Sequence, residues 1–344
     1  MDKAERSFVR KLAREKGLKL VRPAALRLRR QRHGKGFRFL TASGSPIRDP
    51  VEIRRLKSLA VPPAYINVRL AADPNAHLQA IGEDAAGRLQ YRYHPLWAEV
   101  REALKARRLA GLARALPAIR RAVMRGLDAA DCDLRFACAA AVRLVALSAI
   151  RAGSESYVRE HGTRGATTLL KSSLVLGKSH GTLRFKAKGG AVIRKTLRDR
   201  RFLAAARRLG NLPGRRLFQY RDGDGQVRRL RAADVNRFLR EIAGRPISLK
   251  DFRTLLASTS ALKSLARTVP EASVRGRRKQ VRAAVTVIAG ELANTPTVCR
   301  TSYVHDTVVA AFEEGRLSRI AKHGRTTSSA IDLLARIVSR APGG

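Results

Sequence analysis

The sequence predicts an α+β protein: a small, mostly β N-terminal domain followed by a larger, mainly α-helical domain that carries a small antiparallel sheet. Hydrophobic spacing is the first reason, because short runs of period two fill the first part of the chain and helical spacing dominates the rest. Size is the second, since 344 residues with 44% hydrophobic side chains can fill more than one core. We expect the domains to span residues 1–97 and 98–344.

The N-terminal domain is expected to open with an amphipathic helix and a basic run, residues 27–33, that is typical of a solvated or phosphate-touching arm. A helix is predicted after Asp49, which is a suitable N-cap for the apolar spacing that follows. Turn signals such as Asp73-Pro74 separate the strand-like runs. The predicted elements are a strand in 34–40, a helix over 50–59, and strands over 68–70, 77–81 and 89–94.

Residues 88–94 form the most suggestive part of this domain. Period two places Tyr91 and Tyr93 on one face of the strand, with Gln90 on the other. Glutamine can pair bidentately with adenine, and tyrosine can stack or touch phosphate, so the strand is a candidate groove reader. An ordinary strand with its aromatic side chains in the core fits the same pattern.

The second domain is expected to alternate between helices and short strands. Arg151 falls in the last turn of a predicted helix, where the helix dipole already favours a cation. Lys188 precedes two glycines at a tight turn between two strands. A surface lysine is the ordinary finding at such a turn, but a hinged hairpin could also carry a proton donor into a groove. The predicted helices are 98–109, 117–127, 135–152, 198–209, 231–243, 250–267, 275–293 and 326–340, and the predicted strands are 167–170, 173–176, 182–185 and 191–197.

Near residue 250 the sequence predicts another helix start, with Ser248 or Asp251 as its cap. Arg253 would lie in the first turns of this helix. A cation there opposes the helix dipole, so we expect Arg253 to have a further reason for its position.

The charge balance points to a polyanionic partner. The chain has 71 Lys and Arg against 27 Asp and Glu, a formal net charge of +44. Contacts with phosphates release counterions and give strong, salt-sensitive binding, so nucleic acid is the first expectation and an anionic membrane surface the weaker one. Part of the arginine and alanine excess can also reflect the base composition of a genome.

The cysteines and the hydrophobic runs indicate the cellular compartment in which the protein is expected to work. Three cysteines without CxxC spacing indicate a reducing compartment and suggest neither a disulfide framework nor a zinc site. The most apolar run, 136–150, is interrupted by Arg143 and is too short to span a bilayer. We therefore expect a cytoplasmic protein without a membrane segment, a metal or a cofactor.

The candidate catalytic stretch is residues 291–305, which brings Tyr303 close behind Asn294. A phenol with a pKa near ~10 is a poor nucleophile at neutral pH unless cations stabilise the phenolate and the group it attacks. Taken alone, the tyrosine fits better as a packed aromatic near a helix end. Attack on a phosphodiester without metal would need a nucleophile, cations for the non-bridging oxygens and a proton donor for the leaving oxygen. The chain supplies candidates for these roles in the order Arg151, Lys188, Arg253, Asn294 and Tyr303.

Seven short segments follow one another in a distinctive order over about residues 34–306. They are Gly34-Lys-Gly-Phe37, Leu59-Ala-Val-Pro-Pro-Ala64, Gly87-Arg-Leu-Gln-Tyr-Arg-Tyr-His-Pro95, Ile150-Arg-Ala-Gly153 with Tyr157, Gly165-Ala-Thr-Thr-Leu169, Lys250-Asp-Phe-Arg-Thr254 and Asn294-Thr-Pro-Thr-Val-Cys-Arg-Thr-Ser-Tyr-Val-His305. Together they resemble the type IB DNA topoisomerases of the bacterial and poxvirus kind. Each segment alone is a weak signal, whereas seven in the same order are a strong one.

The resemblance implies a fold like that of topoisomerase IB and the tyrosine recombinases, in a monomer that clamps double-stranded DNA with two domains. It implies that Tyr303 forms a 3′-phosphotyrosyl bond, and that strand rotation and religation follow without ATP or metal. Such an isomerase would act at the bacterial nucleoid. The family's catalytic positions fall on Arg151, Lys188, Arg253, Asn294 and Tyr303, and its DNA-contacting positions on Gln90, Tyr91, Tyr93 and Lys250.

The chain departs from the family pattern at three places. Asn294 stands where many relatives have His, which bears on the strength of one phosphate contact. Ser154 stands where Asn is usual, and Leu255-Leu256 where a Trp often follows the Arg-Thr pair. These last two departures concern the support around the pocket.

Two other function classes fit part of the same pattern. A tyrosine recombinase shares the fold and the nucleophile, but typically has His three residues before the second arginine, where this chain has Lys250 before Arg253. The β-rich N-terminal segment also favours a topoisomerase. A non-enzymatic basic DNA-binding protein would explain the charge but not the ordered catalytic set.

Overall fold

The computed structural model describes residues 2–317 and 330–339, and the chain divides into two compact units. The units are Met1–Leu104 and Lys105–Gly344, and the division falls inside the long helix α3 (Trp97–Asp128). The sequence placed the boundary at residue 97, where this helix begins. Helices predominate and the named strands pair antiparallel in small sheets, so the α+β class is confirmed.

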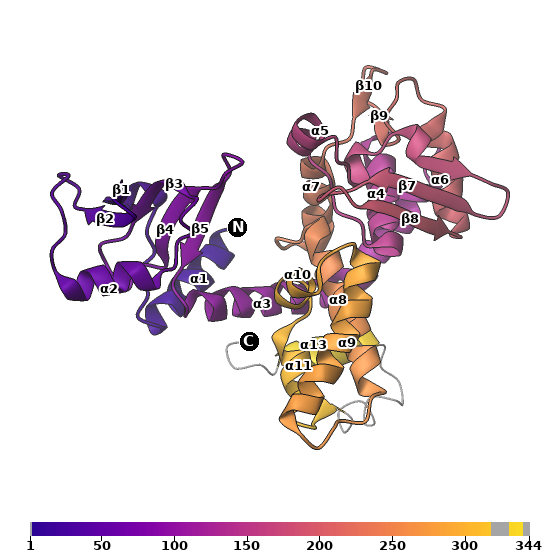
Figure 1. Ribbon diagram of the computed structural model, residues 1–344. Helices are drawn as coiled ribbons and strands as arrows, with labels where there is room; N and C mark the ends of the chain where they lie inside the picture. The colour runs from indigo at the N-terminus through magenta and orange to yellow at the C-terminus, as the bar shows by residue number, and fades with distance from the viewer. Residues whose placement is uncertain (1, 318–329, 340–344) are drawn as a thin grey trace. The chain divides into compact units, whose positions relative to one another are not determined.

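The first unit is built on a five-stranded antiparallel sheet with the order β2-β1-β3-β4-β5 (Figure 1). The basic run at 27–33, expected as an arm, is instead mostly strand β1, paired with both β2 and β3. The two-residue turn between β1 and β2 contains Gly34 at a φ of 55°, which favours a tight hairpin. The elements are α1 (Lys3–Glu15), the 3₁₀ turn η1 (Pro23–Ala25), β1 (Leu28–His33), β2 (Gly36–Leu40), α2 (Pro50–Ser58), β3 (Ile66–Leu70), β4 (Leu78–Glu83) and β5 (Leu89–Tyr93).

Helix α2 covers one face of this sheet. Its predicted cap is confirmed, because the Asp49 carboxylate accepts from the Val51 amide at 2.9 Å. Leu56 of α2 packs with Phe39 and Leu70 of the sheet in a buried cluster. The Arg30 guanidinium secures the loop that follows α2, because it donates to three backbone carbonyls, those of Val61, Pro62 and Tyr65.

In the second unit, α3 continues unbroken through Pro117, so the two helices expected at 98–109 and 117–127 are one. A proline inside a helix removes a backbone hydrogen bond and usually breaks or kinks it. Here the helix is retained because its apolar stripe is buried on both sides of the proline, at Leu112, Leu116 and Ile119.

Helix α4 (Leu134–Ser148) lies in the centre of the second unit and is almost completely buried. Asp133 caps its start by accepting from the Phe136 amide at 2.7 Å. The helix ends at Ser148 rather than at 152, because Ala149 adopts a left-handed conformation with φ 55°. Arg151 therefore lies in the loop after the helix, and its predicted place in the last turn is wrong.

The small sheet of the second unit has the order β6-β7-β8. Its strands confirm the three later strands of the sequence prediction, whereas the strand expected at 167–170 is wrong. That segment begins as a 3₁₀ turn, in which the Gly165 carbonyl accepts from the Thr168 amide at 2.9 Å. The elements are η2 (Ala166–Thr168), η3 (Lys171–Ser173), β6 (Leu174–Leu176), β7 (Gly181–Lys186) and β8 (Val192–Leu197).

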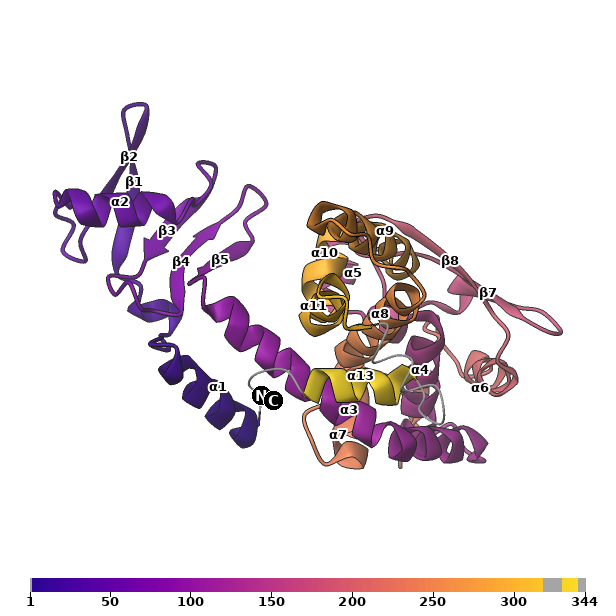
Figure 2. The same cartoon turned by 90° about the horizontal axis from the view of Figure 1, so that it is seen from below.

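The helices after this sheet follow the sequence prediction closely. Figure 2 shows α8, α9, α10 and α11 gathered in one bundle, in which α8 packs against α9 and α11. Helices α5, α10 and α11 and the β9-β10 hairpin were not anticipated, and the first part of the helix expected at 326–340 lies outside the described residues. The elements are α5 (Glu155–His161), α6 (Arg200–Gly210), β9 (Gln219–Arg221), β10 (Val227–Arg229), α7 (Ala232–Ala243), α8 (Leu249–Ala266), α9 (Val274–Leu292), α10 (Pro296–Ser302), α11 (Asp306–Glu313) and α13 (Ala330–Ser339).

No helix in the described ranges is both long and apolar enough to cross a membrane.

Candidate active site

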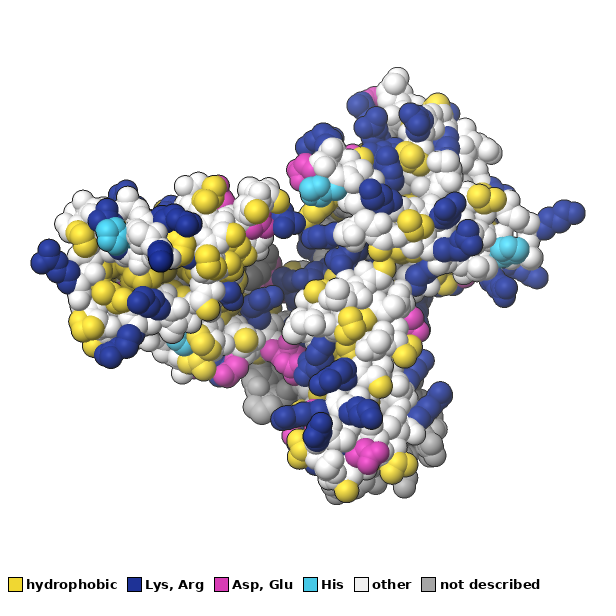
Figure 3. Space-filling view, viewed as in Figure 1, with side chains coloured by type: hydrophobic (Ala, Val, Ile, Leu, Met, Phe, Trp, Pro, Cys, Tyr) yellow, Lys and Arg dark blue, Asp and Glu magenta, His cyan; other side chains and the backbone are white. Residues whose placement is uncertain are grey.

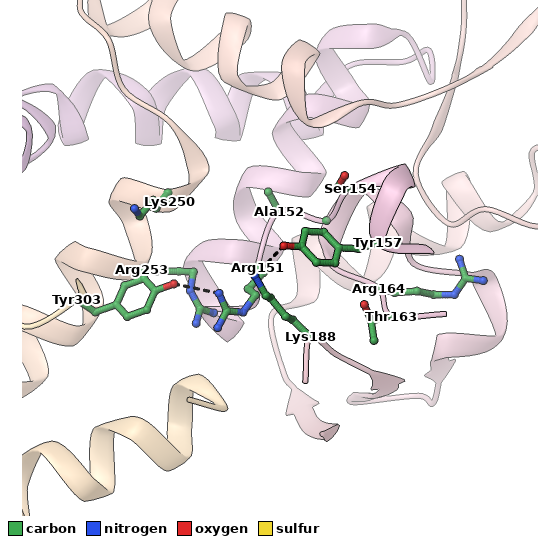
Figure 4. A pocket seen from close by; sticks show the side chains of 11 residues that line it. Arg151, Ala152, Ser154, Tyr157, Thr163, Arg164, Lys188, Lys250, Arg253 and Tyr303 are labelled. Carbon is green, nitrogen blue, oxygen red and sulfur yellow. Dashed lines mark hydrogen bonds between the residues drawn. The ribbon is translucent and has the colours of Figure 1, made fainter. Parts of the chain in front are cut away.

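A pocket of about 350 Å³ in the second unit brings together four of the five predicted catalytic side chains (Figure 4). It is formed where the loop after α4, helix α5, the β7-β8 turn, the start of α8 and the end of α10 meet. None of its lining residues is acidic, and six of them are Arg, Lys or the candidate nucleophile. The lining residues are Arg151, Ala152, Gly153, Ser154, Tyr157, Thr163, Arg164, Lys188, Lys250, Arg253 and Tyr303.

Tyr303 lies at the C-terminal end of α10 and is only 5% exposed. The helix starts as the Asn-Thr-Pro sequence indicates, with Thr295 as N-cap and Pro296 in the first turn. The Tyr303 hydroxyl accepts a hydrogen bond from Arg151 Nη1 at 3.3 Å, and the Arg253 guanidinium carbon lies 4.9 Å from the centre of its ring. The phenol is thus surrounded by cations, as a nucleophilic tyrosine requires.

The backbone around Tyr303 is fixed by a buried serine on α8. Ser258 Oγ donates to the Tyr303 carbonyl at 2.9 Å and accepts from the His305 amide at 3.0 Å. No sequence motif pointed to this serine. Its only signal was a hydroxyl five residues after Arg253, between the apolar residues Leu255 and Leu262 of the predicted helix.

Arg253 is 2% exposed and has a structural role that the sequence did not show. It donates to the Ala149 carbonyl and to the Leu292 carbonyl, the latter at 3.0 Å. These carbonyls lie at the C-terminal ends of α4 and α9, where the helix dipoles are negative, and this accounts for a cation near the start of α8. Burial lowers the pKa of Arg253 below the ordinary value, yet a guanidinium stays charged at neutral pH.

Arg151 is placed by a close backbone contact between two glycines. The Arg151 carbonyl accepts from the Ala166 amide at 2.8 Å, and a Cβ atom added to Gly165 would lie 2.5 Å from that carbonyl oxygen and from the Gly153 nitrogen. Only glycine allows the two loops to approach this closely. The Gly-Ala-Thr-Thr segment therefore supports the position of the arginine.

Asn294 does not line the pocket, but it contacts a residue that does. Its Oδ1 atom accepts from Arg151 Nη2, while its Nδ2 atom is buried and has no hydrogen-bond partner within the described part of the chain. The amide thus orients the arginine and keeps two N–H groups unused.

Lys188 and Lys250 are the exposed cations of the pocket. Lys188 lies in the β7-β8 turn and donates to the Tyr157 hydroxyl at 2.8 Å. Lys250 lies in the first turn of α8, which Ser248 caps and Asp251 supports by accepting from the Ser248 amide at 2.8 Å. Of the two proposed caps, Ser248 is confirmed as the N-cap, whereas Asp251 lies inside the first turn of the helix.

Two polar lining residues, Thr163 and Arg164, were not identified from the sequence. In Figure 4 the Arg164 guanidinium points away from Tyr303, and it donates to the Thr168 carbonyl at 2.9 Å. The residue lies in the loop after α5, where no sequence pattern distinguished it from the many other arginines of the chain.

The candidate DNA-reading strand β5 exposes its aromatic side chains. Tyr91 and Tyr93 are 44% and 42% exposed and stack with their ring centres 6.1 Å apart, so the interpretation as core aromatics is wrong. Gln90 is half-buried and donates to the Asp84 carboxylate at 2.9 Å. Hydrogen bonds, chiefly from Arg88, lower the pKa of Asp84 to about 2, so this acceptor is ionised at neutral pH.

Lysine and arginine side chains are spread over the face shown in Figure 3, where acidic side chains are few. Within residues 2–317 and 330–339, no group of three or more His, Cys, Asp or Glu is arranged to hold a metal ion. The charge that the pocket can offer a ligand therefore comes from its arginines and lysines.

Two family models and one known protein are similar to this chain. A family model described as the catalytic core of eukaryotic DNA topoisomerase I matches residues 97–328. A second, described as the N-terminal domain of bacterial DNA topoisomerase IB, matches residues 36–84. The chain is also 30% identical to DNA topoisomerase 1B of Acanthamoeba polyphaga mimivirus over 260 residues, which are 74% of this chain and 77% of that protein.

Proposed function

The chain belongs to the type IB family of DNA topoisomerases, and from this premise we propose that it relaxes supercoiled DNA through a transient break in one strand. The observation that carries the proposal is the Tyr303 hydroxyl held against Arg151 and beside Arg253 in a pocket without acidic residues. A polyanionic substrate fits this charge, and a phosphodiester gives the tyrosine an electrophile.

In the proposed reaction, Tyr303 Oη loses its proton to water and attacks phosphorus, while the bond from phosphorus to the 5′-oxygen breaks. Arg151 and Arg253 neutralise the non-bridging oxygens, and Asn294 Nδ2 adds a neutral donor. Lys188 gives its proton to the departing 5′-oxygen. The 3′-phosphotyrosyl bond conserves the energy of the phosphodiester, so religation by the 5′-hydroxyl after strand rotation needs no ATP.

The N-terminal unit is proposed to hold the duplex. Gln90, Tyr91 and Tyr93 on β5 supply a polar and aromatic surface, and Lys250 at the mouth of the pocket adds a phosphate contact. We keep the division at 1–97 and 98–344 as the functional one, with a single chain forming the clamp. The proposed location is the cytoplasm, at the nucleoid.

Relaxation of supercoiled plasmid in EDTA, without nucleotide, tests this function. We expect plasmids of both supercoil signs to be relaxed at many turnovers per enzyme molecule, and binding to weaken steeply with salt. Strict dependence on magnesium or ATP would contradict the proposal. A recombinase or a non-enzymatic DNA-binding protein would not relax plasmid catalytically without partners.

The role of Lys188 is tested by changing the leaving group. General-acid assistance is typically worth about 100- to 10,000-fold, so Lys188→Ala should slow cleavage by that order and leave binding nearly unchanged. A 5′-bridging sulfur leaves without a proton and should restore most of the mutant's rate. Lys178→Ala, in the other turn of the same sheet, is the matched control. If sulfur fails to rescue Lys188→Ala, the acid is another residue, and Lys186 and Lys250 are next.

A further inference from the structure

The turn that carries Lys188 does little to hold its side chain. Gly189 and Gly190 follow at φ 84° and 83°, and nothing lies within 4 Å of the place where a Cβ of Gly189 would be. Lys188 itself is exposed. A lysine has a flexible four-carbon stem, so its ammonium would sample many positions unless another group fixed it.

The base of the hairpin is fixed by the backbone. The Lys186 carbonyl accepts from the Arg164 amide at 2.9 Å, and the Ala187 amide donates to the Ala191 carbonyl at 2.8 Å. These contacts tie the end of β7 to the loop after α5. They place the hairpin, but they leave the ammonium of Lys188 at its tip unrestrained.

The hydroxyl of Tyr157 supplies that restraint. Lys188 Nζ lies 2.8 Å from Tyr157 Oη and 4.6 Å from the ring centre. Because the nitrogen is much nearer the oxygen than the centre, it lies at the hydroxyl end of the ring and not over the face. The contact is therefore a charge-assisted hydrogen bond rather than a cation–π interaction.

Tyr157 is itself well supported. It lies in α5, and its carbonyl accepts from the Gly162 and Thr163 amides, the latter at 3.3 Å. The His161 ring packs beside it with the ring centres 5.8 Å apart. Its hydroxyl thus has a defined position at the wall of the pocket, as Figure 4 shows.

We propose that Tyr157 is a positioning residue, whose hydroxyl holds the Lys188 ammonium in the pocket so that the proton donor is in place when the strand is cut. Tyr157 transfers no proton and forms no bond to DNA in this role. The inference rests on the proposed function, in which Lys188 acts as the general acid.

Tyr157→Phe tests the proposal because it removes the acceptor and keeps the ring. We expect cleavage of normal DNA to slow by about tenfold, the order of a hydrogen bond to a charged group, with unchanged affinity and thermal stability. With a 5′-bridging sulfur the rate should return nearly to that of the wild type. Tyr220→Phe deletes a hydroxyl from a half-buried tyrosine outside the pocket and should have no effect.

The double variant Tyr157→Phe/Lys188→Ala decides between positioning and an independent role. If Tyr157 acts through Lys188, the double variant cleaves no more slowly than Lys188→Ala. Multiplied losses, or an equal loss with the sulfur substrate, would overturn the proposal and assign the hydroxyl a direct DNA contact. Failure of sulfur to rescue Lys188→Ala would instead refute the acid assignment, and the double-variant comparison would still decide whether the two residues act together.

Discussion

The pocket and strand β5 both carry tyrosine side chains, but Tyr303 is buried in the pocket, whereas those on β5 are exposed. In the pocket, Tyr303 and Arg253 are 5% and 2% exposed, and Arg253 is bound to backbone carbonyls. On β5, Tyr91 and Tyr93 are 44% and 42% exposed and contact mainly each other and neighbouring rings. This difference is consistent with the proposed roles, because groups that stabilise a transition state work best when fixed in advance, whereas groups that contact DNA must remain accessible.

This difference has an energetic basis. Burying a cation carries a desolvation cost, which is offset in the pocket by carbonyls at the C-terminal ends of α4 and α9. The exposed tyrosines are uncharged and carry no such cost. We therefore expect substitution of the buried cation Arg253 to change both cleavage and stability, and substitutions on β5 to change only DNA binding.

The largest expected effect is that of Tyr303→Phe, which should eliminate the covalent adduct while leaving DNA binding nearly intact. The hydroxyl makes one long hydrogen bond, at 3.3 Å to Arg151, so its loss should change the free energy of unfolding by only about 1 kcal/mol. Adduct trapping on denaturing gels and thermal melting measure the two effects. An adduct that persists would move the nucleophile to another tyrosine, with Tyr157 the next to examine.

Arg253→Ala should combine slower cleavage with lower stability, unlike Tyr303→Phe. Leaving two carbonyls without their donor should cost about 3 kcal/mol, which lowers Tm by roughly 6–12 °C for a unit of this size. Arg253→Lys keeps the charge, so its Tm and its cleavage rate should fall between those of the wild type and those of Arg253→Ala. Arg275→Ala, which removes an exposed arginine from α9, is the control and should leave Tm unchanged. A normal Tm for Arg253→Ala would show that the carbonyl contacts do not support the fold.

Gly165→Ala tests whether the loop after α4 must pack this closely. The residue has an extended φ of −151°, so strain in the backbone is not expected and the effect is steric. The new Cβ would meet the Arg151 carbonyl at 2.5 Å, and overpacking of this kind costs about 1–3 kcal/mol. Gly210→Ala, with no atom within 4 Å, is the control. Cleavage unchanged in Gly165→Ala would show that Arg151 does not depend on this contact.

The smallest effect on stability should come from Tyr91→Ala and Tyr93→Ala. Exposed substitutions usually change the free energy of unfolding by less than about 0.5 kcal/mol, so melting should be unchanged while DNA affinity falls. Binding titrations at several salt concentrations measure this, and the salt slope should stay the same because no charge is removed. A large drop in Tm would contradict the comparison between the two regions.

Local signals in the sequence determined many of the elements. The caps Asp49 and Ser248 and the two-glycine turn after Lys188 each follow from the chemistry of one or two side chains, and each is present in the structure. The amino-acid composition by itself determined the net charge of +44, from which a polyanionic partner was predicted. The ordered family motifs identified the candidate catalytic residues, four of which line one pocket.

Only the tertiary structure decided where those residues stand relative to one another. Helix α4 stops at Ala149 and α3 continues through Pro117, against local propensity, because packing across the unit outweighs the preference of a single residue. The two carbonyls bound by Arg253, the Ser258 contact with Tyr303 and the bond from Lys188 to Tyr157 join residues far apart in the chain. Such contacts follow from the three-dimensional packing of helices and loops, which periodicity and capping signals do not encode.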